Sequence, residues 1–578
     1  LSLKKNDTAF EETVTYSLNE AEANAVIENG NTLKVADSGV GTPIPVTATF
    51  TVNDVSMTRT ESVTITSRHV YDSNGFCTIC NGYQPATKNT ENCYEIGNAG
   101  QLYWFADKVN NDNSNFGSAK AVLTKDIVVN KNVLVNGELN TSESGSFRSW
   151  TPIGNSSSNA YTGTFDGQGH TVSGLYFDDG DKKHVGLFSF IQSGSSIKKV
   201  GVLDSYFNGK NSVGGVCGLS QNGTIENCYS KSYVSGTENI GGVCGYNYAH
   251  ELGIATIKNC HNEGKVSGSD YVGGVCGFNN YDVSEGVATI EYCYNTGEVS
   301  STYHVGGVCG WNRSVHGISE IKNCYNVGKV SGTNYIGGVC GYNYSSSGMS
   351  GITTCFNTGK VSGTGDVIGG VCGLNSQESG AIATVTDCYY LAGCNTESTN
   401  FTCEKGTSKT AEEFASGLVC YLLNGSSSEN PVWYQNIDLD GETADAYPVL
   451  DSNHGTVYYG YDDDACQTPK YSNSRLNAEP IHDYTNNNGF CIRCDAYEPA
   501  TLTTDKYDID GDGDKDEVYE IGNAGQLYWF AALVNGTDGL TQNLGANAVL
   551  TADITVNTGD VANCGGTKQA GWKDWTPI

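Results

Sequence analysis

The sequence is poor in positive charge and in long apolar runs. Its 578 residues include 32 Lys and Arg against 64 Asp and Glu, which gives a formal net charge of -32 at pH 7. This charge repels nucleic acid and anionic membrane surfaces, so we expect neither as a partner. No apolar run reaches the roughly 20 residues that span a bilayer, and we therefore expect no membrane insertion in this segment.

Sequence motifs of catalysis are also missing. There is no HExxH and no GxSxG motif. Enzymes that cleave acidic polysaccharides on β-helices need Lys or Arg to neutralise the substrate, and the repeats described below have little Arg. Asp166 and His170 in "FDGQGH" could form an acid/base pair, but such a phrase is more typical of a turn. We predict no enzymatic activity, no catalytic residue and no organic cofactor.

Methionine is almost absent, whereas cysteine is abundant. The chain has 2 Met and 22 Cys. So many thiols favour an oxidising compartment, and we predict a secreted or cell-surface, extracellular location. The sequence begins at Leu1 without an initiator Met or a signal-like segment, so we expect a processed product or an excerpt with any anchor outside it.

The motif Gly-Gly-Val-Cys recurs about every 32 residues in the middle of the chain. A second motif, such as "IKNCYN", follows each copy and brings a second cysteine. The gap from this second cysteine to the next Gly-Gly-Val-Cys cysteine is 16 or 17 residues, whereas the gap inside a repeat varies from 11 to 17. We expect a fixed path followed by a loop of variable length in each repeat.

Each repeat offers three short β-prone pieces separated by Gly, Asn and Ser. Helical repeats are excluded because each interior Gly costs a helix about 1 kcal/mol relative to Ala. Three stacked strands per repeat predict an all-β, right-handed parallel β-helix with about 32 residues per coil. Equivalent residues of successive coils then form ladders with a spacing of roughly 4.8 Å.

The two cysteines of a repeat occur together. An earlier degenerate repeat lacks both, and its alignment places Ser189 opposite Cys217 and Val200 opposite Cys228. This pattern predicts a disulfide within each coil; the alternative is a ladder of unpaired buried thiols that act as small hydrophobic side chains. The predicted pairs are Cys217–Cys228, Cys244–Cys260, Cys276–Cys293, Cys309–Cys324, Cys340–Cys355 and Cys372–Cys388.

Two further ladders follow from the alternation of side chains along a strand. Val200 indicates that the second cysteine points inward, so the next residue points outward. We predict an exposed aromatic stack that either binds sugars or serves stability alone, and an Asn ladder at a turn. The aromatic set is Tyr229, His261, Tyr294, Tyr325, Phe356 and Tyr389, of which all but His261 are candidate ligand-binding residues. The Asn set is Asn247, Asn279, Asn312, Asn343 and Asn375.

The rest of the chain divides into further parts. Asn98 can cap an amphipathic helix with Leu102, Phe105 and Val109 on one face, and a second such helix is expected over 410–425. We predict that both helices cap the open ends of the solenoid. The predicted boundaries are 1–68 for an immunoglobulin-like β-sandwich, 69–93 for a CxxC knuckle, 94–395 for the capping helix and β-helix, 396–460 for the C-terminal cap, 461–517 for a second knuckle and an acidic linker, and 518–578 for the start of a second β-helix.

Residues 518–578 repeat 94–153 almost word for word. We therefore expect one module and part of the next from a longer repetitive protein. Head-to-tail self-association or further modules of the same chain are the partners that this repetition favours.

Two segments combine a CxxC motif with an upstream His. Cys and His side chains are typical zinc ligands, but only three are visible in each segment and a closed structural site needs four. Disulfides within the CxxC motifs, or with a partner such as Cys466, are the alternative. The candidate ligands are His69, Cys77 and Cys80 in the first knuckle and His482, Cys491 and Cys494 in the second.

The stretch "YDIDGDGDKDEVYE" carries the pattern of a calcium loop. Acidic residues bracket Gly513 at the sixth place, as hard oxygen ligands require, although Tyr519 stands where a bidentate acid usually occupies the twelfth place. An acidic linker insert is the alternative. The candidate calcium ligands are Asp508, Asp510, Asp512, Asp514 and Asp516.

The motifs "GGVCG", "NCYN" and "KVSG", with "WTPIG" and "GTFDGQGHTVSGL" upstream, resemble the GLUG-motif repeats of large bacterial surface proteins. These include adhesin-like proteins and the non-catalytic part of some immunoglobulin A peptidases. The resemblance covers residues 94–460 and 518–578, and residues 1–68 resemble bacterial immunoglobulin-like domains. It implies a surface β-helix and transfers no catalytic residues; this chain differs by placing Cys where an aliphatic residue usually follows Gly-Gly-Val.

These observations together predict a non-catalytic extracellular structural protein of a surface or filament that serves adhesion. Its expected ligand is a glycan or a surface protein, with calcium and zinc as the candidate cofactors. The alternative is a carbohydrate-binding or carbohydrate-active β-helix protein.

Overall fold

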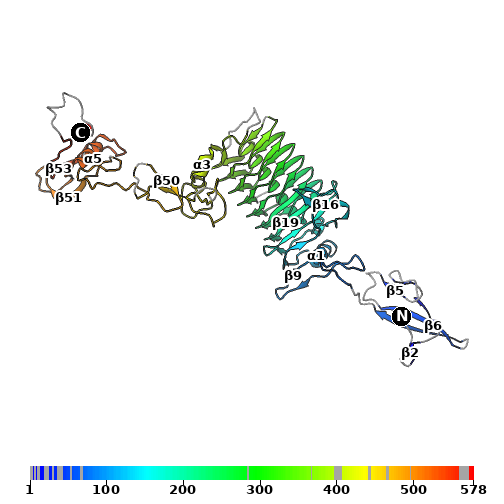
Figure 1. The fold of residues 1–578 in the computed structure, drawn as a ribbon. Helices are drawn as coiled ribbons and strands as arrows, with labels where there is room; N and C mark the ends of the chain where they lie inside the picture. Colours follow the sequence, from blue (N-terminus) through cyan, green and yellow to red (C-terminus); the bar gives the residue numbers. More distant parts are fainter. Residues whose placement is uncertain are drawn as a thin grey trace.

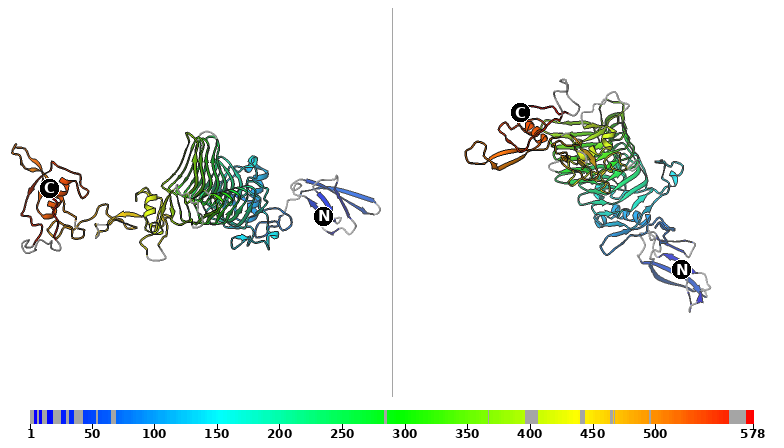
Figure 2. Two further views of the ribbon diagram at one scale, coloured as in Figure 1. Left: turned by 90° about the horizontal axis from the view of Figure 1, so that it is seen from above. Right: turned by 60° about the vertical axis from the view of Figure 1, so that its left-hand side comes forward.

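The computed structural model describes residues 69–558 with short gaps, residues 572–578 and the strands between residues 4 and 64. A column of stacked strands forms the middle of an elongated molecule, with the strands before residue 65 beyond one end and the residues after 500 beyond the other (Figures 1 and 2). The gaps after residue 69 are 283–285, 366, 396–405, 440–443, 464–465, 467, 495 and 559–571.

One coil illustrates the path of the chain through the column. The coil contains β24 (Glu238–Gly241), β25 (Cys244–Ala249), β26 (Ile254–Lys258), β27 (His261–Asn262) and β28 (Val266–Ser267). Each strand pairs in parallel with its equivalents in the neighbouring coils. The prediction of a parallel β-helix is therefore confirmed.

Strands equivalent to β24 and β25 form two parallel sheets on adjoining faces. The six-stranded sheet contains β20 (Asn211–Gly214), β24, β29 (Asp270–Gly273), β34 (Tyr303–Gly306), β39 (Asn334–Gly337) and β44 (Ile368–Gly369). The seven-stranded sheet contains β17 (Phe188–Ile191), β21 (Cys217–Gln221), β25, β30 (Cys276–Tyr281), β35 (Cys309–Ser314), β40 (Cys340–Ser345) and β45 (Cys372–Gln377).

Two larger sheets complete the coils. The 11-stranded sheet contains β8 (Thr87–Lys88), β9 (Tyr94–Ile96), β10 (Ala121–Leu123), β14 (Thr164–Asp166), β18 (Ser196–Lys198), β22 (Thr224–Glu226), β26, β31 (Val287–Glu291), β36 (Ile318–Lys322), β41 (Met349–Thr353) and β46 (Ile382–Thr386). The 15-stranded sheet includes β19 (Gly201–Asn208), β23 (Tyr229–Ser235), β27, β28 and their equivalents, and ends at β47 (Tyr389–Leu391) and β48 (Thr407–Lys409).

The core consists of the same inward side chains in every coil. In the coil that begins with β29, Val272, Val275, Cys276, Ile290 and Cys293 are all fully buried. Stacked aliphatic and thiol side chains therefore fill the interior along the whole column, and their burial supplies the hydrophobic stabilisation of the fold.

The cysteines correct the prediction of disulfides within the coils. All twelve coil cysteines carry free thiols, so none of the six predicted pairs is formed. Each sulfur is satisfied along its ladder or by a carbonyl of its own coil: the Cys228 N–H donates to Cys260 Sγ over 3.4 Å, and Cys276 Sγ donates to the Phe278 carbonyl over 3.3 Å. Burial raises the pKa of Cys388, which favours the protonated thiol.

The alignment of the degenerate repeat explains this error. Phe188, not Ser189, pairs with Cys217, while Gly201 pairs with Tyr229 and so places Val200 beside Cys228. Phe188 and Val200 are both fully buried. Hydrophobic residues thus occupy both cysteine positions in that coil, and the alternative of small buried hydrophobic thiols is the one that the structure supports.

The predicted Asn ladder forms, but its residues lie within strands such as β30 and β35 and not at a turn. Asn279 donates to Asn312 over 2.8 Å, and Asn312 donates to Asn343 over the same distance. A second ladder, which the sequence analysis missed, follows the aromatic residue of "NCYN", where Asn295 donates to Asn326 over 2.8 Å. Buried amides that satisfy one another hold the strands of successive coils in register.

The two glycines of the repeated motif are required by close packing. A Cβ added at Gly273 would lie 2.0 Å from the Cys276 carbonyl, and one added at Gly274 would lie 2.1 Å from the Gly307 carbonyl of the next coil. No side chain fits at either place without moving backbone. The two glycines recur in every such coil because backbone atoms of the same coil and of the next coil leave no room for a Cβ atom.

The N-terminal end of the column is covered as predicted. Helix α1 (Ala99–Asn111) begins at Asn98, whose side chain accepts a hydrogen bond from the Gln101 N–H. Leu102, Phe105 and Val109 are fully buried. They pack with the aromatic and aliphatic side chains of the first coils.

The C-terminal cap differs from the prediction. Two short helices, α3 (Ala411–Ala415) and α4 (Leu418–Leu423), replace the single helix because Gly417 between them has a φ of 88°. The cap also covers one side of the last coils. Phe414 and Trp433 of the cap belong to one hydrophobic cluster with Tyr325, Phe356 and Tyr389 of the predicted aromatic stack.

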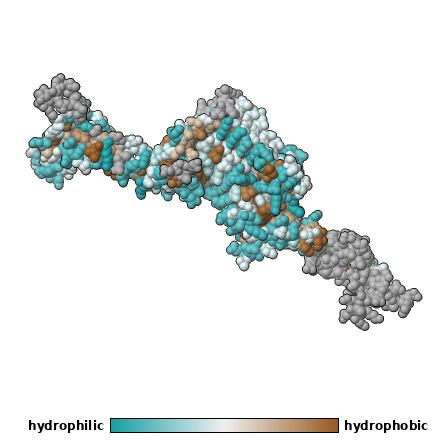
Figure 3. Space-filling view, viewed as in Figure 1, coloured by the Kyte–Doolittle hydropathy of each residue, from teal (hydrophilic) through white to brown (hydrophobic). Residues whose placement is uncertain are grey.

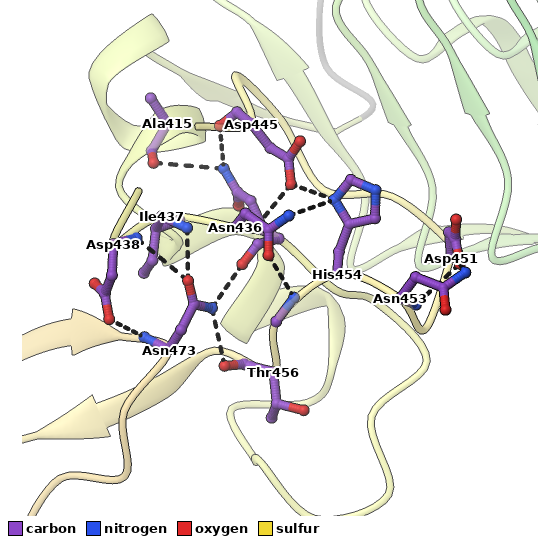
Figure 4. Close-up of polar contacts among 12 residues, drawn as sticks. Ala415, Asn436, Ile437, Asp438, Asp445, Asp451, Asn453, His454, Thr456 and Asn473 are labelled. Carbon is purple, nitrogen blue, oxygen red and sulfur yellow. Dashed lines mark hydrogen bonds and ion pairs between the residues drawn. The ribbon is translucent and has the colours of Figure 1, made fainter. Parts of the chain in front are cut away.

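A polar network holds the segments of this cap together (Figure 4). The Asn473 side chain accepts from the Ile437 N–H over 2.7 Å and donates to the Thr456 carbonyl over 3.1 Å. His454 lies 2.6 Å from Asp445 in the same network.

The two ends of the chain carry smaller sheets. In the N-terminal part, β3 (Val14–Leu18), β6 (Pro43–Val52) and β7 (Val55–Thr64) form an antiparallel sheet, while most side chains there lie outside the described residues. The immunoglobulin-like assignment stays a prediction. Near the other end, β51 (Thr501–Tyr507), β52 (Asp516–Ile521), β53 (Asn547–Leu550) and α5 (Ala524–Asn535) repeat the arrangement of β8, β9, β10 and α1.

The described surface is mainly polar. Hydrophilic side chains predominate on the face shown in Figure 3, with separate hydrophobic spots over the β-helix. Among the described residues, no helix combines the length and the apolar character needed to cross a membrane.

Candidate functional site

A polar cleft lies on the outer face of the 15-stranded sheet. The hairpin of β12 (Leu134–Val135) and β13 (Glu138–Leu139) folds over this sheet and encloses a cavity of about 520 Å³. The hairpin turns at Asn136 and Gly137, whose φ values of 53° and 81° suit a tight Asn-Gly turn. The lining residues include Leu134, Glu138, Leu203, Asp204, Lys231, Glu263, Lys265 and Glu298.

Asp204 is the most unusual residue of this cleft. Its φ of 46° is strained for a non-glycine residue, and it lies where the register between β19 and β23 shifts. The Leu134 N–H donates to its carboxylate over 3.2 Å, which fixes the hairpin to the sheet. Burial raises the pKa of Asp204 above the ordinary value of 3.8. Strain and a perturbed carboxyl group in a cleft are typical of a functional site.

Ion pairs between coils shape the floor of the cleft. Lys231 lies 3.3 Å from Glu263 in the next coil, and Lys265 lies 2.5 Å from Glu138 of the hairpin. Four carboxylates (Glu138, Asp204, Glu263 and Glu298) face two lysines among the lining residues. The cleft is therefore rich in hydrogen-bonding groups but has an excess of negative charge, which disfavours an anionic ligand.

The predicted aromatic ladder forms, but half of it is not exposed. Consecutive rings from Tyr229 to Phe356 stack with centroids 4.6 to 5.0 Å apart. Tyr325, Phe356 and Tyr389 are 6%, 0% and 8% exposed, because the C-terminal cap covers them. The prediction that these three side chains are exposed is therefore wrong. Among the ladder residues, the three nearest the N-terminus (Tyr229, His261 and Tyr294) are partly exposed.

Stacking also limits what the exposed rings can do. The planes of His261 and Tyr294 are inclined by only 2°, so each ring face is covered by the next ring. A sugar would meet ring edges rather than the faces on which sugars stack. The ladder is therefore suited to stabilising the column, and burial raises the pKa of Tyr294 to about 12.

A second aromatic surface was missed by the sequence analysis. Phe278 and Trp311 stack at 4.7 Å, and a parallel column places His304 against Tyr335 at 4.6 Å. Tyr271 stacks on His304 at 5.0 Å and so belongs to this second column, and its φ is positive at 51°. The repeated "CGYN", "CGFN" and "CGWN" motifs carried the signal for the first column, whereas no sequence pattern indicates the left-handed backbone of the second.

The tempting acid/base pair of "FDGQGH" is not assembled. Asp166 accepts a hydrogen bond from the Gln168 N–H over 2.9 Å and lies 3.3 Å from Lys198. His170 instead faces Asp126 at 3.4 Å. Gln168 and Gly169 both have positive φ values, so the phrase forms a turn of the coil, as expected.

The second knuckle brings four potential metal ligands together. One donor atom each from Cys466, His482, Cys491 and Cys494 lies within 4.8 Å of all the others. Burial opposes ionisation of Cys491, but N–H groups of Arg493 and Asp483 outweigh it and lower its pKa to about 6. The sequence analysis did not assign Cys466 to the metal site. The one indication in the sequence is that Cys466 lies close to the knuckle, 16 residues before His482, and outside the coil repeats.

The first knuckle assembles only its three predicted residues. His69, Cys77 and Cys80 form a group of the same kind, with Cys80 Sγ 3.2 Å from His69 Nδ1. Residues 1–68 contain no cysteine that could add a fourth thiolate. The two knuckles thus share their local geometry but differ in the number of donors.

The acidic loop brings part of its predicted set together. Carboxylate oxygens of Asp508, Asp510 and Asp516 lie within 4.8 Å of one another. Asp508 also accepts hydrogen bonds from the Gly511 and Gly513 N–H groups. Asp512 and Asp514 are exposed and lie outside this group of three. Calcium binding stays a prediction.

Comparison with known proteins agrees with the repeat pattern. The GLUG motif matches residues 209–234 and 236–267. Halomucin of Haloquadratum walsbyi is 34% identical over 111 residues, which are 17% of this chain and 1% of that protein. The chain therefore spans about one hundredth of the length of this relative. The family match confirms the GLUG motif in the two coils of residues 209–267.

Two solved structures are also similar to this chain. A protein described as an immunoglobulin A1 protease from Bacteroides ovatus is 18% identical with a TM-score of 0.37, and the match covers 63% of this chain and 93% of that one. A structure named IgA1 Protease is 12% identical with a TM-score of 0.28, and the match covers 64% of this chain and 24% of that one.

Proposed function

Because its coils are GLUG repeats stacked in a parallel β-helix, we propose that this chain is part of a non-catalytic extracellular surface protein that serves adhesion. The β-helix acts as a stiff rod, and the cleft beneath the β12–β13 hairpin binds the ligand. The observation that carries the proposal is the cavity of about 520 Å³ around Asp204 on an otherwise regular solenoid.

The rod supplies rigidity. Successive coils are joined by continuous backbone pairing, by two buried Asn ladders and by a closely packed core. Each coil contacts its neighbours over its whole circumference, so bending requires many contacts to break together. A rod of this kind holds a binding site at a fixed distance from a cell surface.

The cleft supplies the chemistry. Carboxylates and lysines such as Glu263 and Lys231 bind hydroxyl groups well, whereas the excess of carboxylates disfavours a polyanion. Leu134 and Leu203 add apolar wall for the carbon face of a sugar. The ligand that fits this lining is a neutral, hydroxyl-rich glycan.

Binding of the full chain to an array of neutral and acidic glycans tests this proposal. The variant Lys231→Ala/Glu263→Ala removes the ion pair of the cleft floor. The matched control, Lys258→Ala/Glu291→Ala, removes a similar pair, 3.1 Å long, on the 11-stranded sheet. We expect at least tenfold weaker binding of a neutral glycan by the cleft variant and unchanged binding by the control. Equal binding by both variants, or no glycan binding by the wild type, would contradict the proposal.

A carbohydrate-active function is the second candidate. Asp204 favours it, because a carboxyl group with a raised pKa can act as a general acid near other carboxylates. In an enzyme of this kind Asp204→Asn would abolish glycan cleavage while leaving glycan binding nearly intact.

A further inference from the structure

We propose that Cys466, His482, Cys491 and Cys494 bind one zinc ion, which joins the second knuckle to the chain that leaves the C-terminal cap. The inference is independent of glycan binding. It assigns to Cys466 the role of the fourth ligand.

The distances between the donor atoms fit a tetrahedral site. Zinc bonds of about 2.3 Å to sulfur and about 2.05 Å to nitrogen give edges of about 3.8 Å between two sulfurs and about 3.6 Å between sulfur and nitrogen. Cys466 Sγ lies 3.6 Å from Cys491 Sγ, and His482 Nδ1 lies 3.2 Å from Cys494 Sγ. Small adjustments of these side chains reach the ideal geometry.

The surroundings also suit a structural metal. Cys466 and Cys491 are 8% and 1% exposed, so two of the four donors are shielded from water. The Asp483 N–H donates to Cys491 Sγ over 3.3 Å, a contact that orients a thiolate and stabilises its charge. Three Cys and one His form a closed set of the type found in structural zinc sites.

The ligands come from separate parts of the chain. Cys491 and Cys494 share one turn, His482 precedes them by nine residues, and Cys466 lies a further 16 residues upstream. The turn itself is held by the pairing of Phe490 with Tyr497. An ion bound by all four residues would close a loop between the cap of one module and the start of the next, and so stiffen this junction.

The first knuckle provides an internal comparison. His69, Cys77 and Cys80 reproduce the local arrangement: Cys80 Sγ lies 3.2 Å from His69 Nδ1, the same distance as from Cys494 Sγ to His482 Nδ1. With three protein donors the fourth place is left to water or to another ligand. We therefore expect one tightly bound zinc ion at the second knuckle and much weaker binding at the first.

Zinc titration of the full chain tests the inference. The protein is purified in reducing buffer, stripped with a chelator, dialysed and titrated with zinc chloride against a chromogenic chelator. Cobalt replaces zinc in a parallel titration, because tetrahedral cobalt bound to thiolates absorbs visible light. We expect one tight equivalent, with the cobalt spectrum of a tetrahedral site.

Two variants assign the site. Cys466→Ala should weaken the tight equivalent at least 100-fold and change the cobalt spectrum, whereas Cys77→Ala in the first knuckle should leave both unchanged. Thermal melting of the β-helix verifies that both variants fold. The inference is overturned by absence of a tight equivalent, by an unchanged affinity in Cys466→Ala, or by a disulfide between Cys466 and Cys491 in protein that was never exposed to oxidant.

Discussion

Phe188 pairs with Cys217 in the parallel register of β17 and β21, so a large hydrophobic side chain occupies in one coil the place that cysteine occupies in the next. Both residues are fully buried. The position therefore selects apolar volume rather than the chemistry of sulfur, and the solenoid derives its stability from packing and amide ladders without covalent links between its cysteines.

The first prediction concerns these thiols. When the chain is denatured without reductant and alkylated, we expect mass spectrometry to find all twelve coil cysteines modified. Reduction of a disulfide would cost about 2 to 5 kcal/mol of stability. Because the coils contain no disulfide, the melting temperature of the native β-helix should be the same with and without reductant. Six unmodified pairs, or a large fall in melting temperature on reduction, would restore the disulfide interpretation.

A second prediction concerns the Asn ladder. Asn312→Ala removes the amide that donates to the Asn343 side-chain oxygen and to the Ser319 carbonyl, and the oxygen that accepts from Asn279. We expect the free energy of unfolding in urea to fall by about 2 kcal/mol. Asn375→Ala, at the end of the ladder, removes the donor to the Ala383 carbonyl and the acceptor of Asn343, but the site is only partly buried and the loss should be clearly smaller. Equal losses at both positions would argue against a cooperative ladder.

A third prediction concerns the C-terminal cap. Asn473→Ala removes the side chain that bridges Ile437, Asp438 and Thr456, and we expect the cap to lose about 2 kcal/mol of local stability. Faster hydrogen exchange in 430–475 would report this loss. Asn453→Ala is the matched control, since its amide bonds only the exposed Asp451 (Figure 4). The role given to Asn473 fails if both variants exchange alike.

A fourth prediction concerns pH. The folded-state pKa of Asp204 is raised, so ionisation of its carboxyl group opposes folding: the penalty is absent below the ordinary value of 3.8 and is fully present above the raised value. Asp204→Asn keeps an oxygen for the Leu134 N–H but removes the charge. We expect the variant to be more stable than the wild type at pH 7 and equally stable near pH 3. Destabilisation at pH 7 would show that the charge itself has a favourable partner.

A fifth prediction concerns the acidic loop. If it binds calcium through the three clustered carboxylates, titration calorimetry should give a Kd of about 10⁻⁴ to 10⁻³ M, which is usual for extracellular modules. Asp508→Asn should abolish the heat of binding, while Asp514→Asn, outside the cluster, should weaken it only slightly. An acidic linker without a site would give no heat in the wild type.

The periodic features were predictable from sequence. The constant gap between cysteines indicated the coil, and Asn279 and Asn312 could be placed on one ladder because they stand at the same distance from "CG" in successive repeats. Asn98 and the buried face of Leu102 and Phe105 followed from local helix signals. These features depend on contacts that repeat along the chain or lie close in sequence.

Features that depend on irregular contacts could not be predicted. The register of Phe188 was misjudged by one residue because Phe188 follows Val185 by three residues in the degenerate coil, whereas Cys217 follows Val213 by four residues in the next coil. Burial of Phe356 depends on Trp433, which lies 77 residues further on and belongs to no repeat. Asp204 is contacted by the β12–β13 hairpin, and Cys466 lies beside the second knuckle. Neither segment belongs to a repeat, so the repeat pattern could not predict where it lies.

We propose that the chain binds a glycan in the cleft and does not cleave it. The decisive experiment is to incubate the full chain with the glycan that it binds most tightly and then to measure the size of the glycan and count its reducing ends. We expect bound glycan of unchanged length and no new ends over many hours. Shortened glycan, formed by the wild type and absent with Asp204→Asn, would contradict it and establish an enzyme.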